Sequence, residues 1–282
     1  MNLTEILHLS HHGPDTFVGS GPQYPWGGLY GGQIVAQALQ AATETIDPGF
    51  VAHSLRAYFI RRGDHTEPVR YEVDRIRNGR SFCTRRVVAR QSVGAILNLE
   101  ASYHAPEPAE DIETVSLPDG VPVPDELDES SWTPVFERFF VPPERLDLEG
   151  RAGTGRAAAW LRVNEPLGDA PEMHQGGLAY LSDDLPTDAV VRAHPVGREP
   201  KEVIDDVLFV ASLDHAIWFH RPFRADDWNL YDFTCQTFTG GRGLATGHVF
   251  SSGGTHVATI AQEVLLRDSR ARAAAAAPLR ST

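Results

Sequence analysis

The sequence predicts an α+β fold in which one unit, a helix followed by an antiparallel sheet, occurs twice along the chain. Two observations support this prediction. Each half of the 282 residues contains a glycine-led helical stretch and then four strand-like runs, in the same order. Between the halves, from 105 to 150, lies a stretch rich in proline and acidic residues. A repeated order of segments indicates internal duplication, and helices kept apart from antiparallel strands are typical of α+β proteins.

The first half, residues 1–104, begins its repeat with glycines at positions 27, 28, 31 and 32. Apolar and small residues at helical spacing predict a helix over 34–46, which Pro48 terminates. Runs with strand chemistry follow at 51–60, 69–76, 81–90 and 95–104. Asn78-Gly79 joins the second run to the third and is a strong hairpin signal.

The second half, residues 151–267, repeats this order. Its helix is predicted within 174–190, and its strand-like runs lie at 213–223, 229–238, 244–250 and 255–267. A shift of 162 places Gly79-Arg80 on Gly241-Arg242, and a shift of 160 places Ala101 on Ala261. A long helix wrapped by a curved antiparallel sheet is a hot-dog module. The predicted fold is therefore a double hot-dog, with the two sheets joined edge to edge.

The segments outside the repeats are predicted to be irregular. Proline and charge oppose both helices and central strands, so 105–150 is predicted to be a linker. Its middle, 132–140, is apolar enough to dock onto one half. The alanine- and arginine-rich stretch 268–282 is expected to be a disordered tail.

Composition excludes several classes of protein. The net charge of −13 disfavours nonspecific binding to nucleic acid. The sequence has no run of 18 apolar residues and no signal-like N-terminus, so we expect a cytoplasmic protein without a membrane partner. Its two cysteines, Cys83 and Cys235, are too few for a disulfide framework, and we expect both to be reduced. We predict no metal site and no cofactor.

Arginine supplies nearly all of the positive charge, because Lys201 is the only lysine. An anionic ligand would need a local concentration of arginine to overcome the overall negative field. The first half contains one such concentration, formed by Arg61, Arg62, Arg80, Arg85 and Arg86. A charged, solvent-exposed strand face is the alternative interpretation of these residues.

Several short segments, taken in order, resemble a known family. In the first half these are Tyr30-Gly31-Gly32-Gln33, His53-Ser54-Leu55, Arg62-Gly63-Asp64 and Arg85-Arg86-Val87. In the second half they are Ala179-Tyr180 with Ser182-Asp183, Asp214-His215 with the tract Trp218 to Phe223, and Gln262-Glu263. Apart from its tail, the chain is similar to the type II (TesB-like) acyl-CoA thioesterases, which are double hot-dog enzymes. The resemblance implies that an activated water hydrolyses fatty acyl-CoA to free fatty acid and CoA.

The resemblance also implies three catalytic residues. In that family an Asp, a Thr and a Gln hold and activate the water. The matching positions here are Asp183, Ser212 and Gln262. Ser212 keeps the hydroxyl of the family's Thr and loses the methyl group that stiffens the rotamer. A carboxylate can serve as the base, while a hydroxyl and a carboxamide can orient water, because each both donates and accepts hydrogen bonds.

Six more residues are predicted to contact the substrate: Gly31, Gly32, Arg80, Arg85, Asp214 and His215. The two glycines begin a helix, whose N-terminus can bind a thioester oxygen or a phosphate. Asp214 and His215 are neighbours on a strand and point to opposite faces, so they do not pair with each other, and a structural role is the alternative for both. The segment from Tyr30 to Thr43 contains no acid, so we predict one active site per chain, in the second half.

Two other functions remain open from the sequence. The first is an enoyl-CoA hydratase on the same fold, whose Gly-Asp-x-Asn-Pro-x-His motif is partly matched from Gly168 to His174, without the Asn. The second is a non-catalytic acyl-CoA-binding protein, which the Ser212 substitution would permit. Hot-dog proteins usually pair their sheets further, so we expect a homo-oligomer of a dimer or larger.

Overall fold

The computed structural model describes residues 1–146 and 155–270, and the strands it describes form one 13-stranded sheet in which every pair is antiparallel. The first half has helices α1 (Leu3–Leu7) and α2 (Gly31–Thr43). Its strands are β1 (Ser10–His11), β2 (Thr16–Gly19), β3 (Val51–Phe59), β4 (Val69–Asn78), β5 (Phe82–Gln91) and β6 (Gly94–His104). Strands β3 to β6 follow the four predicted runs to within two residues.

The second half contains α3 (Pro171–Leu181), α4 (Pro186–Ala193) and α5 (Lys201–Val207). Its strands are β7 (Phe136–Phe140), β8 (Arg156–Val163), β9 (Leu208–Ser212), β10 (Asp214–Phe219), β11 (Asn229–Thr239), β12 (Arg242–Ser251) and β13 (His256–Asp268). Short 3-10 helices cover Pro124–Glu126, Pro143–Arg145 and Pro195–Arg198. The four strand-like runs predicted for this half correspond to β10 to β13.

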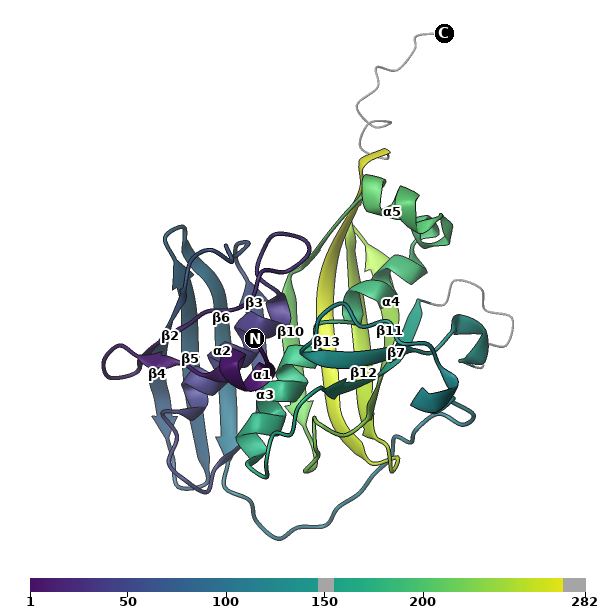
Figure 1. Ribbon diagram of the computed structural model, residues 1–282. Helices are drawn as coiled ribbons and strands as arrows, with labels where there is room; N and C mark the ends of the chain where they lie inside the picture. Colours follow the sequence, from purple (N-terminus) through teal and green to yellow (C-terminus); the bar gives the residue numbers. More distant parts are fainter. Residues whose placement is uncertain (147–154, 271–282) are drawn as a thin grey trace.

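The two halves are arranged symmetrically about the junction between β3 and β10. The strand order is β1-β2-β4-β5-β6-β3 and then β10-β13-β12-β11-β8-β7, so each half repeats the other in reverse (Figure 1). Arg56 of β3 lies opposite Ala216 of β10, while β5 and β12 span 82–91 and 242–251. The offset of the repeat is therefore 160 in these strands, and not the 162 suggested by the glycine match. Duplication and edge-to-edge joining were both predicted.

The helical stretch predicted at 174–190 is two helices. α3 ends at Leu181 and α4 begins at Pro186. A proline inside a helix lacks the N–H of the backbone ladder and its ring collides with a carbonyl one turn earlier, whereas the first helical position tolerates it. Pro186 therefore starts a new helix, and the prediction of a single helix was wrong.

Five of the 13 strands, β1, β2, β7, β8 and β9, were not predicted from the sequence. β8 lies between β7 and β11, and its alanine-rich sequence has little of the β-branched character that marks a strand. β7 lies inside the predicted linker, where residues 132–140 were expected to dock onto one half. Residues 147–150 of that linker, 151–154 of the second half and 271–282 of the predicted tail lie outside the described residues.

The helices α2 and α3 lie side by side on one face of the sheet, at the centre of the molecule (Figure 1). Ten of the 13 residues of α2 are buried, because the helix lies between the sheet and α3. The larger of two hydrophobic clusters therefore spans both halves, and the smaller one lies within the second half and the segment before it. No helix in the described ranges is long and apolar enough to cross a membrane.

Candidate active site

Asp183 lies in the turn between α3 and α4. Ser182 ends α3, and its backbone N–H still donates to the carbonyl of Leu178. Pro186 prevents α3 from continuing, so the chain turns and the Asp183 side chain leaves the helix surface. The residue is only 8% exposed. The predicted catalytic acid is therefore a buried carboxylate, and not a solvent-exposed residue on a helix surface.

The first turn of α2 lies directly against this carboxylate. The backbone N–H of Gly32 donates to Asp183 Oδ2 at 3.0 Å. A Cβ added to Gly31 would lie 2.5 Å from the same oxygen, and one on Gly32 would lie 2.2 Å from the carbonyl of Tyr180. Only glycine permits this approach. The N-terminus of α2 has no side-chain cap of its own, so Asp183 from the other half satisfies one of its free N–H groups.

A β-bulge between β9 and β10 turns two polar residues to the same side. Ser212 pairs with Val264 and Ala216 pairs with Ala261, so this strand has one residue more than β13 over that interval. Residues three apart in a regular strand point to opposite faces. The extra residue instead turns both Ser212 and His215 toward the buried face that holds Gln262, which is typical of bulges beside functional sites.

These residues form one chain of hydrogen bonds that ends on Asp183. Ser212 Oγ donates to Asp183 Oδ1 at 3.1 Å, and Gln262 Nε2 donates to Ser212 Oγ at 2.8 Å. The Gln262 carbonyl then accepts from Nδ1 of His215. His215 Nε2 lies 2.8 Å from Ser182 Oγ, which also donates to the carbonyl of Ala179 at 3.0 Å. Of the two neutral tautomers of His215, only the one protonated at Nδ1 can donate to Gln262, because an amide that donates through Nε2 presents only its oxygen to the histidine.

The charges in this chain of hydrogen bonds follow from burial. Burial raises the pKa of Asp183 to about 6, against the lowering effect of the bonds from Gln262, Ser212 and Gly32. Burial lowers the pKa of His215 to about 4, so this ring is neutral at physiological pH. The site therefore contains one carboxylate, Asp183, that ionises near neutral pH, and a neutral histidine, His215, that hydrogen-bonds to Gln262.

The neighbouring carboxylates have other partners. Asp184 accepts two hydrogen bonds from Arg138, at 2.9 and 3.0 Å, and one from Trp132 Nε1 at 2.6 Å. These bonds join β7 and the segment before it to the turn between α3 and α4. Asp214 points away from His215, as predicted, and accepts from the backbone N–H of Glu263 at 2.7 Å. Of these three acids, Asp183 is the one bonded to the predicted serine.

The first half has no equivalent set of polar residues. Arg56 pairs with Glu100 and its counterpart Ala216 pairs with Ala261, so the last strands of the halves are offset by 161. Ala101 therefore corresponds to Gln262, and not to Ala261 as the sequence match suggested. Leu55 corresponds to His215 at the offset of 160. Both counterparts are buried and apolar, which supports the expectation of a single site per chain.

The two predicted arginines lie elsewhere. Arg85 is 2% exposed and donates to the side chain and carbonyl of Thr45 at 2.7 and 2.9 Å, and to the carbonyls of Arg77 and Thr84. Thr45 lies just beyond the C-terminal end of α2, about 20 Å along the helix from Gly32. Arg80 is exposed in the turn between β4 and β5. The structure does not bring either residue to Asp183, and the contacts of Arg85 are those of a structural side chain.

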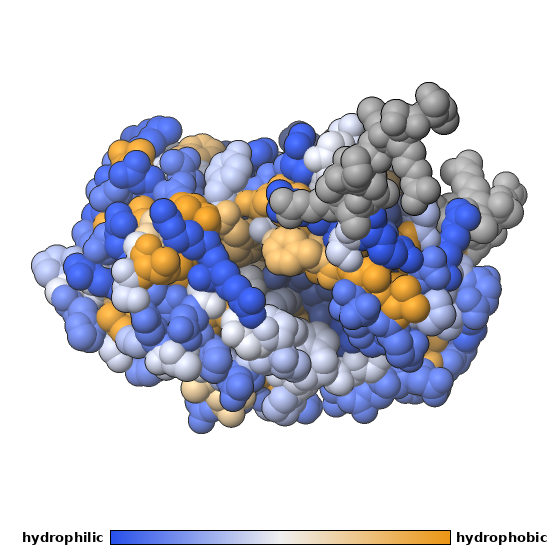
Figure 2. Space-filling model, turned by 90° about the horizontal axis from the view of Figure 1, so that it is seen from above, coloured by the Kyte–Doolittle hydropathy of each residue, from blue (hydrophilic) through white to orange (hydrophobic). Residues whose placement is uncertain are grey.

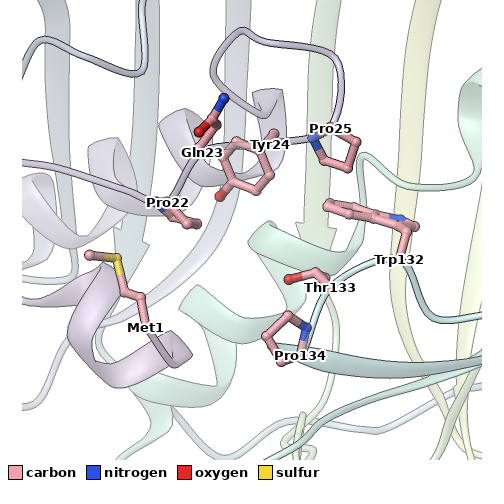
Figure 3. A pocket seen from close by; sticks show the side chains of 8 residues that line it. All are labelled: Met1, Pro22, Gln23, Tyr24, Pro25, Trp132, Thr133 and Pro134. Carbon is pink, nitrogen blue, oxygen red and sulfur yellow. The ribbon is translucent and has the colours of Figure 1, made fainter.

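A pocket of about 340 Å³ opens beside the aromatic residues near the site. It lies between the segment around Tyr24 and the one around Trp132, whose side chains face the cavity from two sides (Figure 3). Both rings contact Tyr30, with centroids 5.7 and 5.2 Å apart. The pocket lining does not include Asp183.

The surface seen from above carries apolar residues in a broken band across the middle of the molecule (Figure 2). Hydrophilic residues cover most of the rest of this face. Among the large apolar side chains that the structure leaves exposed are Tyr58, at 63%, and Phe209, at 56%.

Comparison with known proteins identifies relatives over nearly the whole chain. Residues 21–104 match the model of the acyl-CoA thioesterase N-terminal domain, and residues 109–266 match that of the C-terminal domain. Acyl-coenzyme A thioesterase 8 of Mus musculus is 32% identical, covering 94% of this chain and 88% of its own. Acyl-CoA thioesterase 2 of Haemophilus influenzae is also 32% identical, covering 95% and 98%.

Solved structures agree with the sequence relatives. A crystal structure of the acyl-CoA thioesterase II TesB2 from Mycobacterium marinum superposes with a TM-score of 0.82 at 35% identity, covering 95% of this chain and 98% of that one. A hot-dog protein of Alicyclobacillus acidocaldarius superposes with a TM-score of 0.77 at 18% identity, covering 94% and 97%, and shows the fold alone. The predicted hot-dog fold and the resemblance of the sequence are both confirmed.

Proposed function

We propose that this chain, which belongs to the acyl-CoA thioesterase family and hydrolyses acyl-CoA thioesters, uses Asp183 as the base that activates water. The observation that carries the proposal is the bonding of Asp183 to Ser212 and, through it, to Gln262. A carboxyl group with a pKa of about 6 is ionised at pH 7 to 8 and still accepts a proton readily.

The proposed reaction begins with a water held by these three side chains. Ser212 and Gln262 orient the water, and Asp183 removes its proton as the oxygen attacks the thioester carbonyl carbon. The carbonyl electron pair moves to oxygen to give a tetrahedral oxyanion. When this intermediate collapses, the C–S bond breaks, CoA leaves as a thiolate, and the acid is released. His215 fixes the orientation of Gln262 from behind, so we propose a positioning role for it in place of substrate contact.

Membership of the family does not establish the acyl group of the substrate, the oligomeric state or the cellular location, and we propose each of these. We propose fatty acyl-CoA as the substrate, supported by the apolar band on the surface and the aromatic pocket beside the site. Exposed Tyr58 and Phe209 support a homo-oligomer, because large apolar side chains are often covered by a partner. A cytoplasmic location remains our proposal, which cell fractionation would check.

The geometry gives the hydratase alternative no support. His174 accepts from the backbone N–H of Ala225 and contacts the carbonyl of Gly168 at 2.9 Å. The side chain of Asp169 is 99% exposed and pairs with Arg224. The Asp and His of the partial motif are therefore not assembled into one site.

Release of free CoA thiol from a panel of acyl-CoA chain lengths tests the proposed base. We expect wild type to release thiol and Asp183→Asn to lose most of its kcat, by about 100-fold or more. Asp188→Asn is the matched control, because burial also raises the pKa of Asp188 to about 6, and it should keep wild-type turnover. Wild-type turnover by Asp183→Asn would move the base elsewhere. Tight binding of acyl-CoA by a wild type without turnover would favour the binding-protein alternative.

A further inference from the structure

The hydroxyl group of Tyr30 is buried without a hydrogen-bond partner. Tyr30 is 5% exposed, and no group in the described part of the chain hydrogen-bonds its Oη. Two other buried tyrosines are paired: Tyr24 donates to Gln33 at 2.8 Å and Tyr71 donates to Gln37 at 2.7 Å. A buried hydroxyl without a partner costs about 1–3 kcal/mol, so an unpaired one requires an explanation.

This hydroxyl lies beside the catalytic carboxylate. Tyr30 is the N-cap residue of α2, two positions before the Gly32 N–H that donates to Asp183. The ring folds back over Gly32, because a Cβ built there would lie 2.6 Å from Cε1 and 2.8 Å from Cζ of Tyr30. The hydroxyl is one bond beyond Cζ. It therefore lies at the positive end of α2, over the glycine whose N–H donates to the group proposed to activate water.

The surroundings hold the phenol in place and keep it protonated. Its ring packs edge-on against Tyr180 and Trp132, with centroids 5.1 and 5.2 Å away, and against Trp26 at 6.0 Å. Burial, followed by the nearby charge of Asp183, raises the pKa of Tyr30 well above its usual value. The hydroxyl is therefore a neutral, fixed donor that no protein group in the described residues accepts from.

We propose that Tyr30 donates a hydrogen bond to the thioester carbonyl oxygen of bound acyl-CoA and stabilises the oxyanion that forms there. The inference rests on the proposed function of Asp183. The N–H of Gly32 is already bonded to Asp183, so it is not free to donate to the oxyanion. The water has Asp183, Ser212 and Gln262 to hold it. Tyr30 keeps its proton throughout: Asp183 takes the proton of the water, and the carbonyl electron pair moves onto the oxygen that Tyr30 contacts.

The test is Tyr30→Phe, which removes only the hydroxyl. Because that group has no partner at rest, the variant should be at least as stable as wild type in urea. Its kcat should fall by about 100- to 1000-fold, the range for loss of one oxyanion donor. Tyr71→Phe is the matched control: it removes a buried hydroxyl that already donates to Gln37 at 2.7 Å, so it should lose stability and retain most of kcat.

Two unreactive analogues separate this role from a structural one. In a 2-oxoalkyl-CoA a methylene separates sulfur from the carbonyl, so the carbonyl is kept and the thioester is not. An S-alkyl-CoA thioether lacks the carbonyl altogether. Tyr30→Phe should bind the first about 10-fold more weakly than wild type does and bind the second equally well, as measured by calorimetry. Unchanged kcat, or equal weakening for both analogues, would overturn the inference. If wild type were active, Asp183→Asn inactive and Tyr30→Phe fully active, only this inference would fail; an inactive wild type would instead contradict the proposed function.

Discussion

Replacing Asp183 by Asn should make the protein more stable at pH 8 while abolishing most of its activity. The carboxyl group has an ordinary pKa near 3.8, and burial raises it to about 6 in the folded protein. The folded state therefore binds this proton more tightly than the unfolded state does. The stability that the protonated group contributes is fully present below pH 3.8 and is lost as the pH rises through 6. Asparagine resembles the neutral acid at every pH.

The magnitude follows from the pKa shift. Each pKa unit corresponds to about 1.4 kcal/mol, so a rise from 3.8 to about 6 costs the wild type about 3 kcal/mol at pH 8. At pH 4.5 the same linkage leaves a difference of about 1 kcal/mol. Asparagine can keep the bond from Gly32 through its carbonyl oxygen, and Ser212 can accept from its amide.

Urea denaturation of wild type and Asp183→Asn at pH 8 and at pH 4.5 measures this difference. We expect the variant to have the higher free energy of unfolding at pH 8, with an advantage that shrinks in acid. Equal or lower stability of the variant at pH 8 would refute the reasoning, as would an advantage independent of pH. Burial of the ionised Asp183 carboxylate would then not destabilise the folded protein.

Four other predictions concern the same molecule. Wild-type kcat/KM should rise between pH 5 and 7 with an apparent pKa of about 6 and level off above it, because we propose the ionised form of Asp183 as the base. A profile measured with a short acyl-CoA and flat over this range would contradict that proposal. Ser212→Ala should lower kcat by about 10- to 100-fold, whereas Ser212→Thr, which keeps the hydroxyl, should remain within about threefold of wild type in the thiol-release assay. His215→Leu introduces the residue type of its first-half counterpart, Leu55, and should leave the Gln262 carbonyl unpaired. We expect the free energy of unfolding in urea to fall by about 1–3 kcal/mol, and kcat to fall with little effect on KM. A large rise in KM would instead indicate substrate contact. Arg85→Met should destabilise the protein by about 2–4 kcal/mol, because the Arg85 guanidinium donates to the carbonyls of Thr45 and Arg77. The kcat/KM of the folded fraction should be unchanged. A stable variant with raised KM would favour the substrate contact predicted from the sequence.

Local sequence patterns are sufficient to predict eight of the 13 strands and the duplication of the repeat. Glycine-led helices, β-branched runs and glycine turns are local signals, so β3 to β6 and β10 to β13 were predicted close to their observed bounds. β8 was missed because alanine carries little strand signal, and its place is decided by pairing with β7 and β11. Pro186 is a local signal for a break in the second helix, although a single helix was predicted across it. The turn that holds Asp183 was therefore not predicted from the sequence.

The tertiary structure alone decided how the site is assembled. Ser212 and His215 are three residues apart and would point to opposite faces of a regular strand. The one-residue bulge opposite β13 turns both toward Gln262, and no local pattern marks it. The bond from Gly32 to Asp183 joins residues 151 apart, and the pKa of Asp183 depends on the burial that this meeting of the two halves creates. The side chains were present in the sequence, but their faces, partners and charge states depend on contacts between strands and helices distant along the chain.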